Sequence, residues 1–404
     1  MQIQPILAAL RKHRLATILI ALEIALACAV LCNATSMIAG RIAAMRMVSG
    51  VDESALGNIA VTGFDPAQAN DLNARMLTGL RAIPGVQDAN VVSSVPFGPQ
   101  WGVAGISLDQ AGKRSGGVIE FYEGGPGTPQ ALGLRLVAGH MPGADDYQPL
   151  QGYMPPNPRV LITRTLAEHL WPGENPLGKE FWGMNITFRV IGVVEHLMVS
   201  QYTETGVRGA DWSVFVPAAP GGMLSGNYVV RADPQNIDRV MTEAKAAVRT
   251  IAPDVVLDHD TSRTVGELRH AFFKTDRAMA GILLGVIAAL LLVTALGIVG
   301  LASFWVAQRR KQIGIRRALG ATRADILRYF QIENFLIVTF GIVLGIVLAV
   351  GINLSLMKLF EVPRLPYWYL PIGALVLWLL GQLAVLAPAL RAAAVPPVVA
   401  TRSV

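Results

Sequence analysis

Four long runs of apolar residues constrain this 404-residue chain more than any other feature. The run over residues 15–39 contains one ionisable residue, Glu23, and the runs over 278–307, 334–357 and 368–390 contain none. A hydrocarbon core ~30 Å thick is crossed by roughly 20 apolar residues in a helix. Each run is therefore long enough to span a membrane, and we expect four transmembrane helices over these ranges.

The composition agrees with a membrane protein. Hydrophobic residues make up 52% of the chain and charged residues only 15%, whereas soluble domains are about a quarter charged. The first run follows Arg11, Lys12 and Arg14 as a signal peptide would. It is longer than the roughly 7 to 15 apolar residues of such a signal, so we expect a retained anchor.

Basic residues predict the orientation of the spans. Three precede the first run, and seven lie in the segment 308–333. Because cytoplasmic loops carry the excess of Lys and Arg, we expect residues 1–14, 308–333 and 391–404 in the cytoplasm. Residues 40–277 and the turn 358–367 then lie outside. The expected location is the inner membrane, with both termini cytoplasmic.

The net charge of +6 does not indicate a nucleic-acid-binding protein. The external region from Gly40 to Asp276 holds 19 basic and 24 acidic residues. The positive excess therefore belongs to the membrane and cytoplasmic segments, where it sets topology and contacts anionic lipid. No nucleic-acid partner is expected.

The external region contains a weak internal repeat. Two strand-helix-strand units are expected, with strands at 58–64, 86–94, 227–232 and 252–260 and helices at 66–83 and 237–251. Such units pair into a small α+β lobe, here 58–100 together with 226–262. The stretch 101–225 is rich in Gly and Pro, with short strands such as 159–163 and 185–194. It predicts an inserted, mostly β lobe.

Two flanking segments are predicted to be helical. Residues 36–48 and 264–277 keep apolar residues on one side, so we interpret them as extensions of the first two spans that form a stalk. The alternative is that they are juxtamembrane linkers. The predicted fold class is an α-helical membrane protein with four transmembrane helices and a large α+β external domain on a helical stalk.

One segment resembles a phosphate-binding loop in part. Residues 173–179, GENPLGK, match the GxxxxGK core, but Glu180 stands where the hydroxyl that binds Mg²⁺ is needed. The segment also follows a predicted helix instead of a buried strand. We therefore interpret it as a Gly-Pro turn.

Other catalytic and metal-binding patterns are weak. The cluster Asp258, His259 and Asp260 could ligate a metal ion, but a polar strand end at the surface is the favoured interpretation. There is no HExxH or GxSxG pattern. We expect no catalytic residue, no metal site and no cofactor in this chain.

Glu23 is the one carboxylate predicted within a span. It is costly there unless it is protonated, paired or turned toward protein. It lies beside small residues that include Ala25 and Ala29, which would let another helix approach closely. It is either a buried interface or gating acid, or a protonated or snorkelling side chain at a helix contact.

Two further pairs of small residues predict helix contacts. Gly281 and Gly285 form a GxxxG face in the second run, and Gly341 and Gly345 form another in the third. GxxxG faces allow close packing of helices within membranes. Together with Glu23, Ala25 and Ala29, the pair Gly281 and Gly285 is a candidate intramembrane interface.

The basic segment between the second and third runs carries a helix signal. Gly314 and Gly320 flank the sequence IRRAL, and a helix then restarts with Thr322 as N-cap and Asp325 three residues later. We expect a short cytoplasmic helix joined to both spans by turns. Such a helix could serve topology and lipid contact alone, or dock into a groove of a partner protein.

The segment RRKQIGIRRALGATRADILRYFQIENFLIVTFGIVLG resembles the corresponding run of permeases of the macrolide-exporter and FtsX type, the MacB/FtsX-like or type VII ABC transporters. LGLRLVAGHMPGADD, RVLITRTLAEHLWPGENPLGKEF and FRVIGVVEH resemble external segments of the same family. One departure is Gln312, which stands where the family usually has Glu.

The resemblance implies a permease subunit of the macrolide-exporter branch without its own ATPase. The short helix would dock on a cytoplasmic ATP-binding subunit, which holds ATP and Mg. The permease would dimerise through its first two spans, as a homodimer or heterodimer. Candidate coupling residues are Arg316, Arg317, Ala318, Leu319, Gly320, Ala321, Thr322, Arg323 and Asp325.

The implied activity is mechanotransmission. ATP-driven motion would pass along the stalk to the periplasmic domain, which would act with a periplasmic adaptor and an outer-membrane duct in efflux. The alternatives are a lipoprotein-release permease and an FtsX-like regulator of a periplasmic enzyme.

Overall fold

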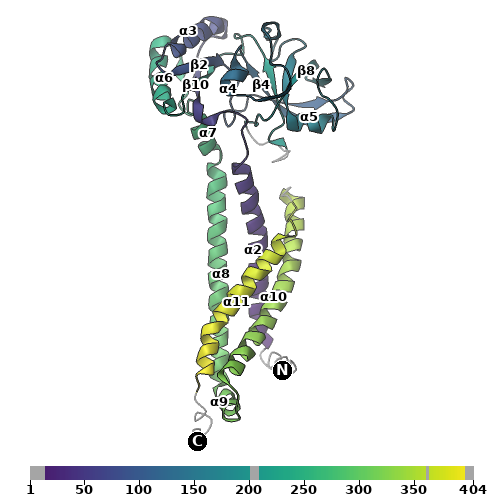
Figure 1. Cartoon of the computed structure of the whole chain (residues 1–404), viewed down its shortest axis with the longest axis vertical. Helices are drawn as coiled ribbons and strands as arrows, with labels where there is room; N and C mark the ends of the chain where they lie inside the picture. The colour runs from purple at the N-terminus through teal and green to yellow at the C-terminus, as the bar shows by residue number, and fades with distance from the viewer. Residues whose placement is uncertain (1–13, 201–208, 361–363, 396–404) are drawn as a thin grey trace. The chain divides into compact units, whose positions relative to one another are not determined.

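A computed structural model describes residues 14–200, 209–360 and 364–395 of the chain. The chain forms two compact units (Figure 1). The membrane unit comprises the described residues up to Met45 and from Thr275 onward, and the external unit comprises Arg46–Lys274.

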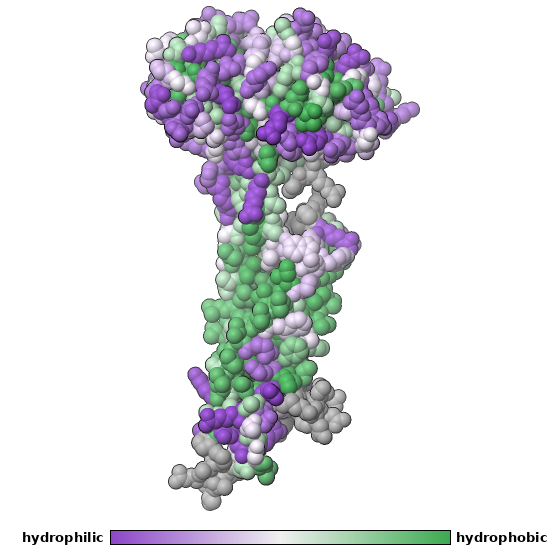
Figure 2. All heavy atoms as spheres, in the orientation of Figure 1, coloured by the Kyte–Doolittle hydropathy of each residue, from purple (hydrophilic) through white to green (hydrophobic). Residues whose placement is uncertain are grey.

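The membrane unit is built from long apolar helices. They are α2 (Arg14–Met45), α8 (Lys274–Gln308), α10 (Arg323–Phe360) and α11 (Tyr369–Ala393), with the short α9 (Arg310–Ala318) between α8 and α10. All four long helices are apolar enough to cross a membrane, with mean hydropathies between 2.1 and 2.9. Hydrophobic side chains cover much of the surface of these helices in Figure 2. The four predicted spans are confirmed as helices of this length and composition.

Helices α2, α10 and α11 pack tightly through small residues. A Cβ on Gly341 would stand 2.8 Å from Cβ of Ile24, and one on Gly345 would stand 2.5 Å from Cβ of Cys28. A side chain at either glycine would push α2 and α10 apart. The predicted GxxxG face of the third span is therefore a contact within this chain.

Buried amides add hydrogen bonds between the same helices. Asn33 of α2 donates to the carbonyl of Ala349 at 3.1 Å, and Asn334 of α10 donates to the carbonyl of Gly381 in α11 at 2.9 Å. In hydrocarbon an amide without partners is costly, so these bonds fix the register of the helices.

The third span differs from its prediction. It was expected over 334–357, after a separate short helix that begins at Thr322, but α10 runs without interruption from Arg323 to Phe360. The short helix is α9 instead, and it lies before Gly320. Gly314 does not break it, because Gly314 is buried in a packed face of α9 and needs no unusual backbone.

The external unit contains a four-stranded sheet with two helices. Its strands are β1 (Leu56–Thr62), β2 (Val86–Val91), β10 (Asn227–Ala232) and β11 (Val256–Leu257), in the order β11-β1-β10-β2 with all neighbours antiparallel. The helices α3 (Ala69–Arg81) and α6 (Ile237–Ile251) complete two strand-helix-strand units. This is the split βαβ arrangement, as the internal repeat predicted.

The helices share one core with this sheet. Leu72, Met76 and Leu80 of α3 are fully buried, one helical turn apart, as their spacing predicts. They meet Val240 and Ala244 of α6 in a common hydrophobic cluster that includes the strands.

A second sheet is inserted between β2 and β10. Its strands are β3 (Gly102–Ser107), β4 (Ser115–Gly124), β5 (Leu136–Gly139), β6 (Arg159–Thr163), β7 (Glu180–Gly183), β8 (Ile186–Val194) and β9 (Ser213–Pro217), in the order β5-β8-β6-β9-β4-β3-β7. Because β7 pairs with both β3 and β8, the sheet closes into a barrel with β5 added outside. Closure leaves few free strand edges.

The barrel interior is apolar. Phe121, Phe181 and Phe188 are fully buried. The Phe188 ring stacks on that of Phe181 with centroids 5.0 Å apart and lies tilted against that of Phe121 at 5.1 Å. The short helix α5 (Arg164–Leu170) packs on β6 and β8 of the barrel, whereas α4 (Thr128–Leu132) packs on β2 and β10 of the four-stranded sheet. Short 3-10 turns lie at Glu53–Ala55, Pro66–Gln68 and Ala144–Asp146. The GENPLGK segment lies between α5 and β7 as a turn, with positive φ at Gly173 and Gly178.

The predicted helical flanks are only partly continuous. Helix α2 extends to Met45, but residues 264–277 do not form one extension of the second span. Helix α7 (Val265–Phe272) starts from a capping box between Thr264 and Glu267, and its Val265 and Leu268 are buried within the external unit. Helix α8 then begins anew at Lys274. The apolar side chains of α7 pack within the external unit, so the helix predicted over 264–277 is divided into α7 and the start of α8.

Candidate coupling site

The inner face of α9 is packed against α10 and α11. Ile313 and Gly314 are buried. Ile313 belongs to one hydrophobic cluster with Ile326 and Phe330 of α10 and with Ala389 and Ala392 of α11. The short helix is therefore supported from behind by both of its neighbours.

The opposite side of α9 presents apolar side chains. Ile315 is 45% exposed and Leu319, which ends the helix, is 82% exposed. Residues four positions apart lie on one face of a helix, so the two form a single apolar patch. Ile315 was not among the predicted coupling residues, although its i, i+4 spacing from Leu319 would have identified it.

The arginines of α9 divide between two roles. Arg317, predicted to contact a partner, is turned inward and donates to the carbonyls of Ala393 and Val395 at 3.0 Å each. It therefore satisfies the C-terminal end of α11. Arg316 is exposed, and its guanidinium lies 5.0 Å from the ring centre of Tyr329.

The turn after α9 is a Schellman motif. Gly320 has φ +100°, its N–H donates to the carbonyl of Arg317, and the N–H of Ala321 donates to the carbonyl of Arg316. This pattern ends helices at a residue in the left-handed region, which glycine adopts at little cost.

The predicted cap of the next helix is confirmed. The N–H of Asp325 donates to the hydroxyl of Thr322 at 3.2 Å, and the N–H of Thr322 donates to the carboxylate of Asp325 at 3.0 Å. This is a reciprocal capping box. Arg323, Ala324 and Asp325 are exposed on the first turn of α10.

An ion pair joins the α8–α9 junction to α10. Arg309 separates the two helices, and its Nη1 lies 3.0 and 2.9 Å from the two carboxylate oxygens of Glu333. The Glu333 side chain is only 1% exposed and that of Arg309 is 12% exposed. The sequence placed both residues at the ends of the basic segment but did not predict that they meet.

The candidate intramembrane residues fall into two groups. Ala25 and Ala29 are fully buried on α2. Glu23 is half-buried and points toward α8, where a Cβ on Gly297 would stand 2.7 Å from its Oε2. Gly281 and Gly285 have open space where a side chain would be. The described part of the chain therefore leaves the glycine face of the second span uncovered, and its use in a dimer interface remains a prediction.

The external cluster around Asp258 is a turn. Its Oδ1 accepts hydrogen bonds from the N–H groups of Asp260 and Thr261. Within residues 14–200, 209–360 and 364–395, no group of three or more metal-ligating side chains is brought together.

The external unit also has an open groove of about 640 Å³. It lies where the inserted barrel leaves the four-stranded sheet, and Trp101 and Met223 from the two connecting segments line it, with Phe64 and Asn227. Its volume is in the range of small-molecule sites, roughly 300 to 1,000 Å³.

Comparison with known proteins identifies two family domains. The MacB-like periplasmic core domain matches residues 17–248, and the FtsX-like permease C-terminal domain matches residues 284–397.

Individual relatives share limited identity. The macrolide export ATP-binding/permease protein MacB of Aggregatibacter actinomycetemcomitans is 25% identical over 303 residues, which cover 73% of this chain and 44% of that protein. MacB of Marinobacter nauticus is 30% identical over 48% of this chain and 30% of that protein. This chain thus spans less than half the length of these two relatives.

Other relatives match over different shares. The uncharacterized ABC transporter permease YknZ of Bacillus subtilis is 26% identical, over 60% of this chain and 61% of that protein. The crystal structure of the periplasmic region of MacB from Actinobacillus actinomycetemcomitans matches 56% of this chain and 95% of that structure, at 16% identity and a TM-score of 0.36. Since the two family models together cover most of the chain, it belongs to the MacB/FtsX-like permease family.

Proposed function

We propose that this chain is the permease subunit of an ATP-driven ABC transporter, and that α9 is its coupling helix. The observation that carries the proposal is the exposed apolar patch of Ile315 and Leu319 on a helix that is packed from behind. Exposed apolar side chains on a short amphipathic helix suit a groove in a partner protein. Family membership makes the ATP-binding subunit of the transporter that partner.

The orientation follows from the basic residues of the α9 segment. It places α9 and both termini in the cytoplasm, and the external unit in the periplasm. ATP and Mg belong to the partner subunit, and the chain itself performs no catalysis. A second permease chain completes the transporter, and the open glycine face of Gly281 and Gly285 is available to it.

Efflux of periplasmic substrates is the role that we propose for the complex. Macrolide export appears in the names of several relatives, and the external groove has the size of a ligand site. Motion of α9 would pass through the membrane helices to the external unit, with a periplasmic adaptor and an outer-membrane duct downstream.

Native co-purification tests this assignment. The tagged chain, extracted in mild detergent from its own host, should carry an ATP-binding subunit identified by mass spectrometry. The double variant Ile315→Ser with Leu319→Ser should lower recovery of that subunit by about tenfold, since exposed apolar anchors dominate such interfaces.

The matched control is Val256→Ser, which removes an exposed apolar side chain from the external unit. It should leave recovery unchanged. Equal recovery of the ATP-binding subunit with the α9 variant would reject α9 as the docking helix, and absence of any such subunit from the wild-type preparation would reject the transporter assignment.

A further inference from the structure

Helix α8 is held differently from the other membrane helices. Its buried residues are Thr294, Ile298, Ala302 and Trp305, all in its second half, while Ile282, Leu284 and Leu292 are about 61% exposed. By contrast, α2, α10 and α11 share a core that runs through most of their lengths. Apolar packing within the chain therefore attaches α8 to the bundle mainly toward its α9 end, and an ion pair between Asp276 and Arg41 of α2 holds its first turn.

The polar contact at that end is directional. Arg309 is the one residue between α8 and α9, and its guanidinium binds both carboxylate oxygens of Glu333 from α10. The same guanidinium lies 5.5 Å from the ring centre of Trp305, one helical turn earlier in α8. The junction between α8 and α9 is thus fixed to one point on α10.

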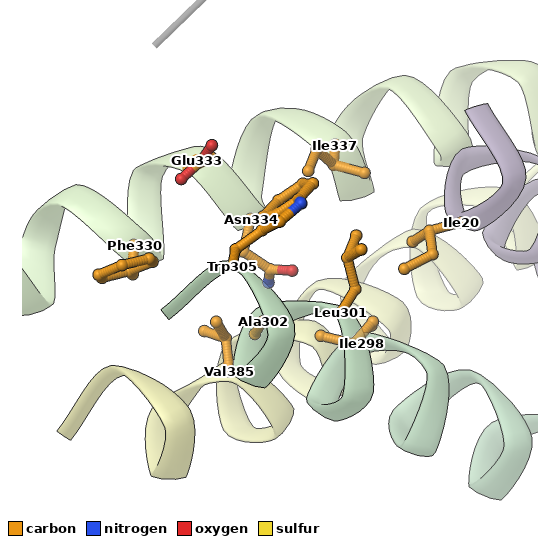
Figure 3. A pocket seen from close by; sticks show the side chains of 10 residues that line it. All are labelled: Ile20, Ile298, Leu301, Ala302, Trp305, Phe330, Glu333, Asn334, Ile337 and Val385. Atoms are coloured by element: carbon orange, nitrogen blue, oxygen red, sulfur yellow. The ribbon is translucent and has the colours of Figure 1, made fainter. Parts of the chain in front are cut away.

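The apolar packing beside this contact is incomplete. Figure 3 shows the side chains around a cavity of about 20 Å³, with Ile298 and Leu301 from α8 facing Asn334 and Ile337 from α10. That is room for about one water molecule. Apolar contacts are non-directional, whereas hydrogen bonds between the guanidinium and both carboxylate oxygens require one geometry, so the ion pair is the more specific restraint.

Stabilisation of the fold does not by itself account for a buried ion pair at this position. The cost of removing both charges from water often cancels their attraction, and an apolar pair of similar volume is often as stable. Ion pairs are better suited to fixing one geometry among several. Here the geometry is the angle at which α8 leaves α9.

We propose that Arg309 and Glu333 are positioning residues that form the joint between the coupling helix and α8. Displacement of α9 moves the adjoining end of α8 because Arg309 is the one residue between the two helices and Glu333 holds it to α10. This inference rests on the proposed function of α9, but the joint itself exists without any partner. A distance measured across it therefore tests the inference separately from the transporter assignment.

The first measurement uses the full chain alone in lipid nanodiscs. Spin labels at Phe304→Cys of α8 and Arg328→Cys of α10, both exposed positions, report the distance across the joint by pulsed EPR. The native Cys28 and Cys32 are buried. We expect a narrow distance distribution in the otherwise native chain and a broad one with Glu333→Gln.

The control is Arg310→Gln, which removes a charge from an exposed side chain next to Arg309 and leaves the ion pair intact. It should leave the distribution narrow. If Glu333→Gln fails to insert into the membrane, the double variant Arg309→Met with Glu333→Met takes its place, because it leaves no unpaired buried charge. The proposal expects this pair to insert normally and still to broaden the distribution.

The second measurement uses the complex with its ATP-binding subunit. With the joint broken, the subunit should bind as before, while the ATP-driven change in the α8–α10 distance is lost and transport falls by about tenfold. Charge exchange between the two positions is a poor rescue, because Arg316 also interacts electrostatically with Glu333.

The outcomes separate the two ideas. A narrow distribution and full transport in the Met pair would reject the joint and leave the coupling role of α9 intact. If the wild-type chain binds no ATP-binding subunit, the proposed function is rejected. The joint is retained in that case if the α8–α10 distance distribution still broadens in the variants that lack the ion pair.

Discussion

The carbonyl oxygen of Ala25 in α2 lies 2.8 Å from the position that a Cβ on Gly345 of α10 would occupy. Backbone approach this close is possible only without a side chain at Gly345. The glycine therefore sets the separation of the two helices, and its neighbours Cys28 and Gly341 belong to the same close contact.

Gly345→Val should separate α2 from α10. Overpacking of a tight helix contact typically costs about 1 to 3 kcal/mol, so the thermal unfolding temperature of the detergent-solubilised chain should fall. Gly285→Val is the matched control, because open space surrounds Gly285. It should unfold like the wild type, and any loss of dimer in that variant would place the second span at the interface between chains. Equal destabilisation by both variants would contradict the close contact.

Gly320→Ala should weaken the turn between α9 and α10 by about 1 kcal/mol, the usual cost of the left-handed region for an L-residue. Among the residues that the structure describes, no atom lies within 4 Å of the added Cβ, so the cost comes from backbone conformation. Gly320→Asn should cost less, because asparagine tolerates this region better. In denaturant unfolding, the free energy of unfolding should be highest for the wild type, lower for Gly320→Asn and lowest for Gly320→Ala. An alanine variant as stable as the wild type would exclude strain at this turn.

Glu123→Gln should change how the stability of the external unit depends on pH. Burial raises the pKa of Glu123 to about 7 from its ordinary 4.5. Between these values the unfolded chain loses its proton while the folded chain keeps it, so stability falls as pH rises from 4.5 to 7 and is then constant. The loss is on the order of 3 kcal/mol at most.

The glutamine variant should lack this decline. Thermal unfolding of the full chain should show similar stability for both proteins near pH 4.5 and a more stable variant at pH 8. Glu168→Gln, which changes an exposed glutamate, serves as the control and should follow the wild type. A variant that declines with pH as the wild type does would show that Glu123 is ionised in the fold.

The sequence predicts those elements whose pattern is local. Four apolar runs predict the long helices, the spacing of Leu72, Met76 and Leu80 predicts the buried face of α3, and Thr322 with Asp325 predicts a cap. In each case the determining residues lie within one or two helical turns of each other, or within one continuous run.

Features that depend on distant residues were not predicted. Closure of the barrel needs β7 to pair with β3 and β8 at once, and strand alternation says nothing about partners. Arg309 and Glu333 are 24 residues apart and meet because α9 folds back onto α10. The two GxxxG pairs look alike in sequence, but α2 covers one of them and no residue that the structure describes covers the other.

The insertion point of the barrel has an evolutionary consequence. The chain leaves the four-stranded sheet after Val92 and returns at Asn227, and these two points are joined by hydrogen bonds from Val92 N–H to Asn227 and from the Asn227 side chain to Ser93. Because the two ends of the insertion meet on neighbouring strands, the sheet keeps its register whatever the length of the chain between them. Within the insertion, α4 packs on β2 and β10 of that sheet, so the strands of the barrel are the part whose length can change with least effect on the sheet.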